Sequence, residues 1–229
     1  MTNLGHVKAE TEPDGRLILP AAPELFVVKY EQQGVDEWIV PDGVTKVFVS
    51  GCGGGGAGHN SSGSYKSTAG GITSFGTQIS LSGGGAGSGQ VSKGGGKPGG
   101  FGGSYGGVGS VDQTPAQYSV GKVGGIGGSS LFGVGGVPTT SMHYSFVEPT
   151  NGTGFGSGGA GFLLGTSSYS GDWGATGGGG GECCIDKEIA TVPGERVQIT
   201  IGSAGIYREG NYLHGYNGTG GLLIIKYSK

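Results

Sequence analysis

Residues 51–58 read Gly-Cys-Gly-Gly-Gly-Gly-Ala-Gly, and residues 177–181 are five glycines in succession. Runs of this kind recur through the middle of the chain. Of the 229 residues, 59 are glycine, and 47 of those lie between residues 51 and 181. Glycine usually makes up ~7% of a protein, and each glycine inside a helix costs ~1 kcal/mol relative to alanine. The composition therefore predicts essentially no α-helix, and it excludes helical bundles, coiled coils and doubly wound nucleotide-binding domains.

The glycine runs lack the strict Gly-X-Y period of collagen. Two other interpretations remain: a flexible linker, and a packed bundle of polyglycine or polyproline-II helices. In such a bundle, residues without a Cβ let neighbouring helices approach closely enough to exchange lateral backbone hydrogen bonds. We favour the bundle, because apolar and aromatic residues are spaced through the runs and a linker needs none. We expect these aromatic residues to cover the glycine bundle: Phe75, Phe101, Phe132 and Phe155.

Both ends of the chain carry strand signals. Residues 25–30, 38–40 and 45–50 are rich in β-branched and aromatic residues, and the last of these alternates, with Val47 and Val49 on one face. Pro41-Asp-Gly43 and Pro193-Gly194 are good turn sequences. Matching strand patterns follow at the C-terminal end, in residues 188–192, 196–201 and 222–227.

These patterns together predict a mostly β and irregular fold. A bundle of polyglycine or polyproline-II helices is flanked by a small antiparallel sheet or sandwich built from both chain ends. Residues 1–36 are interpreted as an N-terminal attachment or oligomerisation segment. Residues 37–229 form the main domain, with a glycine-rich core at 51–181 and closing strands at 182–229.

No constellation of catalytic residues is visible. The histidines His6, His59, His143 and His214 lack the spacing of a metal site. Glycine strings that match dinucleotide fingerprints are expected by chance in such a composition, and no strand-helix context follows them. We therefore expect no enzyme activity, no cofactor and no metal. An ion held on an oligomer axis by one histidine per chain stays open.

Charge and apolar runs restrict the kinds of partner that we expect. The net charge is -3 with no basic stripe, so no nucleic-acid partner is expected. No apolar run reaches ~18 residues, so we expect no membrane insertion.

Three cysteines, Cys52, Cys183 and Cys184, are a poor disulfide framework. They are interpreted as small buried or half-buried side chains of a protein made in a reducing cytosol, with no spacing that indicates a redox or zinc role.

The segments between the glycine runs are the candidate binding surface. They combine aromatic side chains with Ser, Thr, Gly and Asn, a mixture typical of antibody paratopes. Whether these aromatic side chains bind a partner or shield the glycine bundle stays open at this point. The candidate binding residues are Tyr65, Tyr118, His143, Tyr144, Phe146, Tyr169 and Trp173.

Several motifs support a family resemblance. Residues 37–56 read Glu-Trp-Ile-Val-Pro-Asp-Gly-Val-Thr-Lys-Val-Phe-Val-Ser-Gly-Cys-Gly-Gly-Gly-Gly, and a Ser-Phe-Gly element follows at 74–76. A Val-Pro-Gly motif at 192–194 and an Ile-Thr-Ile-Gly motif at 199–202 precede the final apolar strand. This order resembles glycine-rich domains of bacteriophage tail proteins. It is also similar to the tail-fibre tip adhesins of T-even-type phages, in which glycine-rich motifs alternate with variable loops.

The resemblance implies a virion protein at the tail-fibre tip, synthesised in the host cytoplasm. Its loops would bind a receptor on the bacterial outer surface, either an outer-membrane protein or a glycan, and other tail-fibre subunits would be its partners. A homotrimer and a monomeric cap both fit. The alternatives are a structural tail or fibre-assembly subunit without receptor binding, and an ice-binding protein on the same kind of bundle. The latter would need a regular threonine face, whereas the threonines here are scattered.

Overall fold

The computed structural model describes residues 10–11, 17–18, 24–59, 66–89, 95–107, 122–138, 140–141, 149–161, 175–208 and 216–229. Within these ranges the regular structure consists of β-strands and contains no helix, which confirms a mostly β fold there. The strands are β1 (Glu10–Thr11), β2 (Leu17–Ile18), β3 (Leu25–Tyr30), β4 (Gly34–Ile39), β5 (Lys46–Cys52), β6 (Lys66–Ser67), β7 (Thr73–Phe75), β8 (Ile79–Leu81), β9 (Lys122–Val123), β10 (Gly133–Val134), β11 (Thr140–Ser141), β12 (Thr153–Gly154), β13 (Cys183–Ala190), β14 (Arg196–Ile201), β15 (Tyr207–Arg208) and β16 (Leu222–Ser228).

One four-stranded antiparallel sheet joins the two ends of the chain. Its strand order is β13-β5-β16-β3, so two strands from the N-terminal zone pair with two from the C-terminal zone. The alternation predicted for β5 is confirmed, because Val47 and Val49 are buried whereas Lys46 and Phe48 are exposed. The pattern of period two thus determines which face of β5 meets the core.

A second four-stranded antiparallel sheet has the order β4-β14-β7-β8. The expected boundary between residues 36 and 37 falls inside β4, which pairs with β14 along its whole length. The hairpin β7–β8 comes from inside the glycine-rich zone. Phe75 in β7 is fully buried in the core between the sheets, so the prediction that it covers the glycine bundle is wrong. The reason is local: buried Thr73, Phe75, Ile79 and Leu81 alternate with exposed or half-buried serines and form a short amphipathic hairpin.

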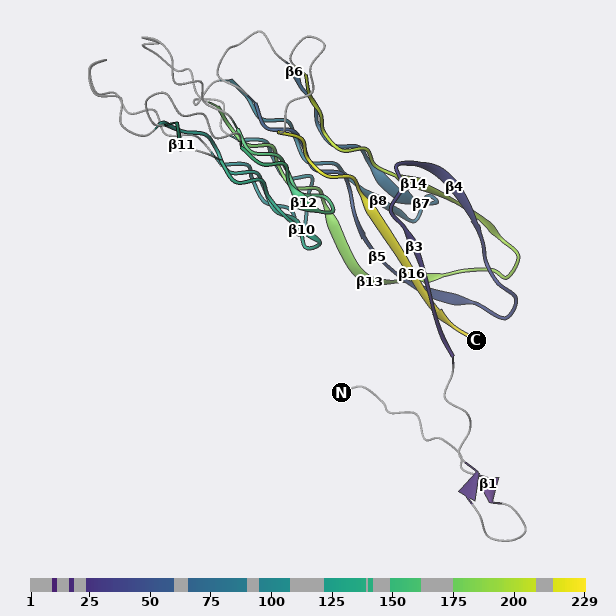
Figure 1. The fold of residues 1–229 in the computed structure, drawn as a ribbon. Coiled ribbons are helices and arrows are strands. Elements are labelled where there is room, and N and C mark those ends of the chain that lie inside the picture. Colours follow the sequence, from purple (N-terminus) through teal and green to yellow (C-terminus); the bar gives the residue numbers. More distant parts are fainter. Residues whose placement is uncertain are drawn as a thin grey trace, which may run out of the picture.

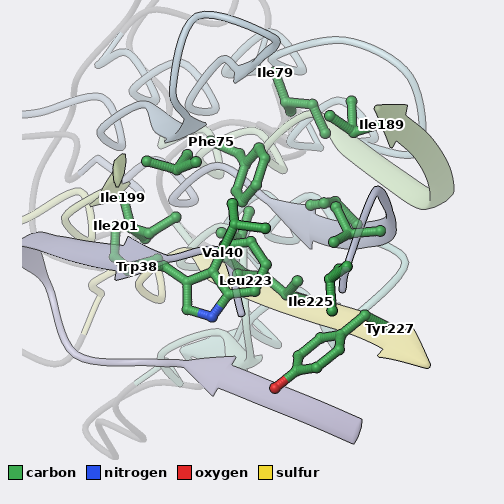
Figure 2. Packing of buried hydrophobic residues seen from close by; sticks show 14 of the residues in the cluster. Trp38, Val40, Phe75, Ile79, Ile189, Ile199, Ile201, Leu223, Ile225 and Tyr227 are labelled. Carbon is green, nitrogen blue, oxygen red and sulfur yellow. The ribbon is translucent and has the colours of Figure 1, made fainter. Parts of the chain in front are cut away.

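The facing sides of the two sheets form one apolar core, shown in Figure 2. Trp38 belongs to this core, and its ring centroid lies 6.0 Å from that of Phe75 and 5.8 Å from that of Tyr227. Fully burying one large apolar side chain contributes ~1.5–3 kcal/mol, so this core is the main hydrophobic stabilisation of the described structure. The other buried members are Val40, Val44, Val47, Val49, Ile79, Leu81, Ile189, Val197, Ile199, Ile201, Leu223 and Ile225.

The two predicted turns are confirmed. Gly43 has a φ of 81°, and the N–H of Val44 donates to the carbonyl of Pro41 at 3.1 Å. Gly194 has a φ of 80°, and the N–H of Glu195 donates to the carbonyl of Val192 at 3.0 Å. Glycine occupies these left-handed positions without the steric cost that a Cβ would add.

The glycine runs extend away from the two sheets and lie side by side (Figure 1). Residues 175–182 form a central run whose N–H groups donate to three different neighbouring runs in turn. Every third residue therefore bonds to the same neighbour. Thr176, Gly179 and Glu182 donate to Ser88, Gly85 and Ser82; Gly177 and Gly180 donate to Gly107 and Ser104; Gly178 and Gly181 donate to Gly159 and Gly156.

Residues 53–58 form a second central run with the same period. Successive N–H groups donate to the run at 175–182, to residues 68–71 and to residues 216–219. Its carbonyl groups accept from three further runs, at 84–87, 159 and 205. A run with six neighbours has another backbone close to it on every side. The longest glycine stretches are therefore the central ones, because glycine has no side chain to prevent this approach.

The close approach explains the absence of side chains. A Cβ added at Gly178 would overlap the carbonyl oxygen of Gly56, and one added at Gly56 would overlap the carbonyl oxygen of Gly85. Both obstacles are backbone atoms of neighbouring runs, which cannot rotate away as a side chain can. Glycine is therefore required at these positions by packing.

The aromatic residues of the runs have different roles from those expected. Phe101 is 74% exposed, so the expectation that it covers the glycine bundle is wrong. Phe132 and Phe155 are partly buried and pack on the apolar cluster where the runs meet the first sheet.

Candidate functional site

The seven candidate binding residues lie outside the described residues. They are Tyr65, Tyr118, His143, Tyr144, Phe146, Tyr169 and Trp173. The structure describes the residues on either side of the segments that contain these candidates. These flanking residues therefore define the candidate site.

Flanking residues far apart in the sequence meet at the central run. The N–H of His59 donates to the carbonyl of Thr176 at 2.9 Å, and the N–H of Thr176 donates to the carbonyl of Ser88 at 3.2 Å. The N–H of Gly177 donates to the carbonyl of Gly107 at 3.0 Å. Four undescribed segments, 60–65, 90–94, 108–121 and 162–174, thus begin or end within one small area.

The remaining flanking residues adjoin the same area. Lys66 pairs with Arg208 across the two-stranded ladder of β6 and β15, and the N–H of Gly58 donates to the carbonyl of Tyr216 at 3.0 Å. Thr150 follows the segment around residues 139–148, and its carbonyl accepts from the N–H of Ala160 at 3.3 Å. Figure 1 shows β6 and β11 at the end of the runs that lies away from the C-terminus. We call this area the distal end.

The up-and-down path of the chain explains why these positions coincide. Successive runs alternate in direction, so every second connection falls at the distal end. Near the sheets the connections are the hairpin β7–β8 and short turns, with glycine in the left-handed region at Gly102, Gly154 and Gly156. The longer connections between runs therefore all begin and end at the opposite side.

Buried aromatic residues support the distal end from below. The rings of Tyr207 and Tyr216 lie 5.1 Å apart in an edge-on arrangement, and the His59 ring lies 6.3 Å from that of Tyr207. Tyr207 and Tyr216 form a small core with Ala57. The sequence reasoning missed this cluster. Its signal was present, since Tyr207 and Tyr216 stand on either side of the segment 209–215.

Polar side chains hold the flanking backbone in place. The hydroxyl of Thr176 accepts from the N–H of Ser88 at 2.6 Å, and the hydroxyl of Ser67 donates to the carbonyl of Gly58 at 2.7 Å. The side-chain carbonyl of Asn217 accepts from the N–H of Tyr207 at 2.8 Å. These short-range contacts fix the positions from which the segments extend.

Among the described residues, no group of three or more His, Cys, Asp or Glu side chains is placed to hold a metal ion. Lys66 and Arg208 bring two exposed cations to opposite positions of one ladder at the distal end. In the part of the chain that the structure covers, no helix has the length and apolar character needed to span a bilayer.

Comparison with protein-family models and with curated proteins gives no match to this chain.

Proposed function

We propose that the chain is a phage tail-fibre tip adhesin that binds a receptor on the bacterial surface through segments held by a polyglycine-II core. The observation that carries the proposal is topological. All seven candidate residues belong to segments that begin and end on described residues of the distal end. A surface that gathers several sequence-distant segments at one tip suits recognition of a large partner.

The hydrogen-bond period supports a polyglycine-II core. A polyproline-II helix has three residues per turn, so every third N–H points the same way. The N–H groups of 175–182 donate to three neighbouring runs with that period. A run of eight residues in this conformation spans about 25 Å, long enough to separate the distal end from the two sheets.

The composition of the segments supports a protein or glycan receptor. Tyrosine and tryptophan provide contact area at low entropic cost, and Ser, Gly and Asn provide adaptable hydrogen bonds. The net charge of -3 provides no strong field toward a polyanion. An outer-membrane protein loop and a neutral glycan both fit this surface, and the virion tail tip is the place where such a surface would act.

Adsorption to bacterial cells tests the proposal. The full chain is labelled and its binding to a panel of strains is measured by flow cytometry. We expect strain-selective binding that falls at least tenfold in the variants Tyr144→Ala and Trp173→Ala. The matched control is Phe101→Ala, which removes an exposed aromatic side chain outside the segments and should bind as the parent does.

Exchange of segments between related phages provides the second test. Residues 137–151 and 162–170 are transplanted into a related fibre protein, and the host range of the resulting phage is measured. A shift toward the donor's host range is expected. Unchanged host range, together with absence of binding by the isolated chain, would argue against an adhesin.

A structural subunit of the tail or fibre is the second candidate. The exposed apolar residues Leu25 and Val27 on β3, and Val35 and Ile39 on β4, favour it. Both strands are sheet edges, which commonly pair with another chain. Association with other virion proteins without any binding to cells would favour this alternative.

A further inference from the structure

Two cysteines far apart in the sequence lie directly opposite each other. Cys52 ends β5, Cys183 begins β13, and the two are cross-strand partners in the antiparallel ladder. The N–H of Cys183 donates to the carbonyl of Phe101 at 2.7 Å and not to Cys52, which makes this a non-hydrogen-bonded pair. In such pairs the Cα atoms lie about 4.5 Å apart, within the ~4.4–6.8 Å that a disulfide spans.

The side chains of this pair share one face of the sheet. Cys52 and Cys183 are 0% and 3% exposed and pack with Leu222, Phe132 and Phe155. The third cysteine, Cys184, points to the other face, where its thiol donates to the carbonyl of Val49 at 3.6 Å. The expectation of buried or half-buried free cysteines is therefore confirmed. Of the three cysteines, Cys52 and Cys183 are the two that lie opposite each other on one face of the sheet.

The two thiols differ in acidity. The hydrogen bond from the Cys52 thiol lowers the pKa of the Cys183 thiol below its ordinary value. The same hydrogen bond, with burial, raises the pKa of Cys52. Cys183 is therefore the more readily ionised member of the pair, and the thiolate is the form of a cysteine that attacks an oxidant.

We propose that Cys52 and Cys183 form an oxidisable pair that a peroxide converts to a cross-strand disulfide. The Cys183 thiolate attacks hydrogen peroxide, the O–O bond breaks, and a sulfenic acid and hydroxide form. The Cys52 sulfur then attacks the Cys183 sulfur, the S–O bond breaks, and the S–S bond forms. The Cys52 proton and the released oxygen leave as water. In total two thiols and one peroxide give one disulfide and two waters.

The disulfide would join the two central glycine runs where they enter the sheet. Residues 53–58 continue directly from Cys52, and residues 175–182 lead directly into Cys183. A cross-link here closes a loop from residue 52 to residue 183, which restricts the unfolded chain. The reduced protein made in a cytosol would thus become more resistant to unfolding after exposure to an oxidising medium. This inference does not depend on the proposed function.

Peptide mapping without reduction tests the pairing. The full chain is treated with hydrogen peroxide, the remaining thiols are alkylated, and the digest is analysed by mass spectrometry. We expect the peptide containing Cys52 joined to that containing Cys183, lighter by two hydrogen atoms than the separate peptides, with Cys184 alkylated. The control Cys184→Ser should give the same cross-link. Alkylation of both Cys52 and Cys183, or a Cys183–Cys184 link, would overturn the proposal.

Thermal unfolding tests the consequence. Oxidised parent and oxidised Cys184→Ser should unfold several degrees above their reduced forms, and dithiothreitol should abolish the difference. Cys52→Ser and Cys183→Ser should show no rise on oxidation. A cross-link that leaves the unfolding temperature unchanged or lowers it would overturn the stabilising role. The mapping of the parent chain decides the pairing even if a serine variant fails to fold.

Discussion

At the scale of single residues, the glycines of this chain are of two kinds. Gly43 and Gly194 are required by a left-handed backbone conformation in turns, with nothing near an added Cβ. Gly178 is required by packing, because an added Cβ would overlap the carbonyl oxygen of Gly56. The amino-acid composition does not distinguish the two kinds. Substituting a glycine, however, has different consequences at the two kinds of position.

Gly178→Ala should destabilise the protein strongly. Its Cβ would force apart two central runs whose backbones are held by neighbours on all sides, and such overpacking typically costs ~1–3 kcal/mol, occasionally more. The matched control is Gly220→Ala, where the nearest atom to an added Cβ lies 3.7 Å away. That control should be neutral or stabilising by up to ~1 kcal/mol. Urea unfolding of both variants checks this, and equal destabilisation would contradict it.

Asp186 is a second residue whose role depends on tertiary structure. It has a φ of 45° at an irregularity in β13, and its carboxylate accepts from Lys226 at 2.8 Å and from Ser50 at 3.0 Å. These hydrogen bonds lower the pKa of Asp186 below its ordinary value. Its ionised form therefore stabilises the fold above the unfolded pKa of about 4, and the contribution is lost as pH falls through the lower folded pKa.

The variant Asp186→Asn tests this pH dependence. Asparagine tolerates the left-handed conformation but carries no charge for Lys226. The parent should exceed the variant in urea midpoint at pH 7, and the difference should shrink as pH falls below about 4. Added salt should also shrink it, because the pair is exposed. A difference that is constant from pH 7 to pH 3 would assign the effect to the backbone instead.

At the scale of elements, the strands of the two chain ends could be predicted from the sequence, but the strand-by-strand pairing could not. The alternation in β5 and the turns at Pro41 and Pro193 indicated the elements correctly. The hairpin β7–β8 lies inside the glycine-rich zone, and it completes the second sheet by pairing with β14. Pairing between distant strands uses backbone groups that every residue carries, so the local pattern did not specify it.

Phe75→Ala should show how firmly the hairpin β7–β8 belongs to the core. Truncating a fully buried phenylalanine costs ~3–5 kcal/mol, through lost burial and the cavity that remains. Phe101→Ala, at a 74% exposed position, should change stability by less than ~0.5 kcal/mol. Denaturant unfolding of the two variants measures the contrast. Equal, small effects would mean that β7 does not dock between the sheets.

The hydrogen bonds of the central run at 175–182 predict slow exchange of its amide protons. Each N–H from Gly177 to Gly181 donates to a neighbouring run. These amides should exchange with deuterium orders of magnitude more slowly than unstructured glycine, and in one cooperative unit with the core strands. Mass spectrometry of peptides covering this run provides the measurement. Exchange at the unstructured rate would show that the lateral hydrogen bonds do not persist in solution.

At the scale of the whole molecule, the structure has two parts that are stabilised differently. Two sheets lie at one end, and the glycine runs extend from them to the distal end. The apolar core lies between the sheets, and the backbone network lies between the runs. Among the described residues, the distal end has the small apolar cluster of Ala57, Tyr207 and Tyr216. The lateral hydrogen bonds between the runs join residues on either side of the segments attached there.

Replacing residues 163–173 by a short Gly-Ser linker should therefore leave stability nearly unchanged. Gly161 and Ala175 both hydrogen-bond to Gly125, at 2.8 and 2.9 Å, so the ends of the replaced segment are already held together. Loop length alters closure entropy only slowly, by ~0.6 kcal/mol per doubling. Under the proposed function, binding to bacterial cells should be lost. A fall in unfolding temperature of many degrees would instead assign this segment to the packed structure.

The sequence by itself determined the strand-rich ends, the turns, the exclusion of helix and the central glycine zone. These follow from local properties: alternation of apolar residues, the fixed φ of proline and the missing Cβ of glycine. The tertiary structure decided which runs lie side by side, why the segments share one end, and that Cys52 meets Cys183. The runs bond through backbone groups that are the same in every glycine, so the neighbours of each run are set by the whole folded chain.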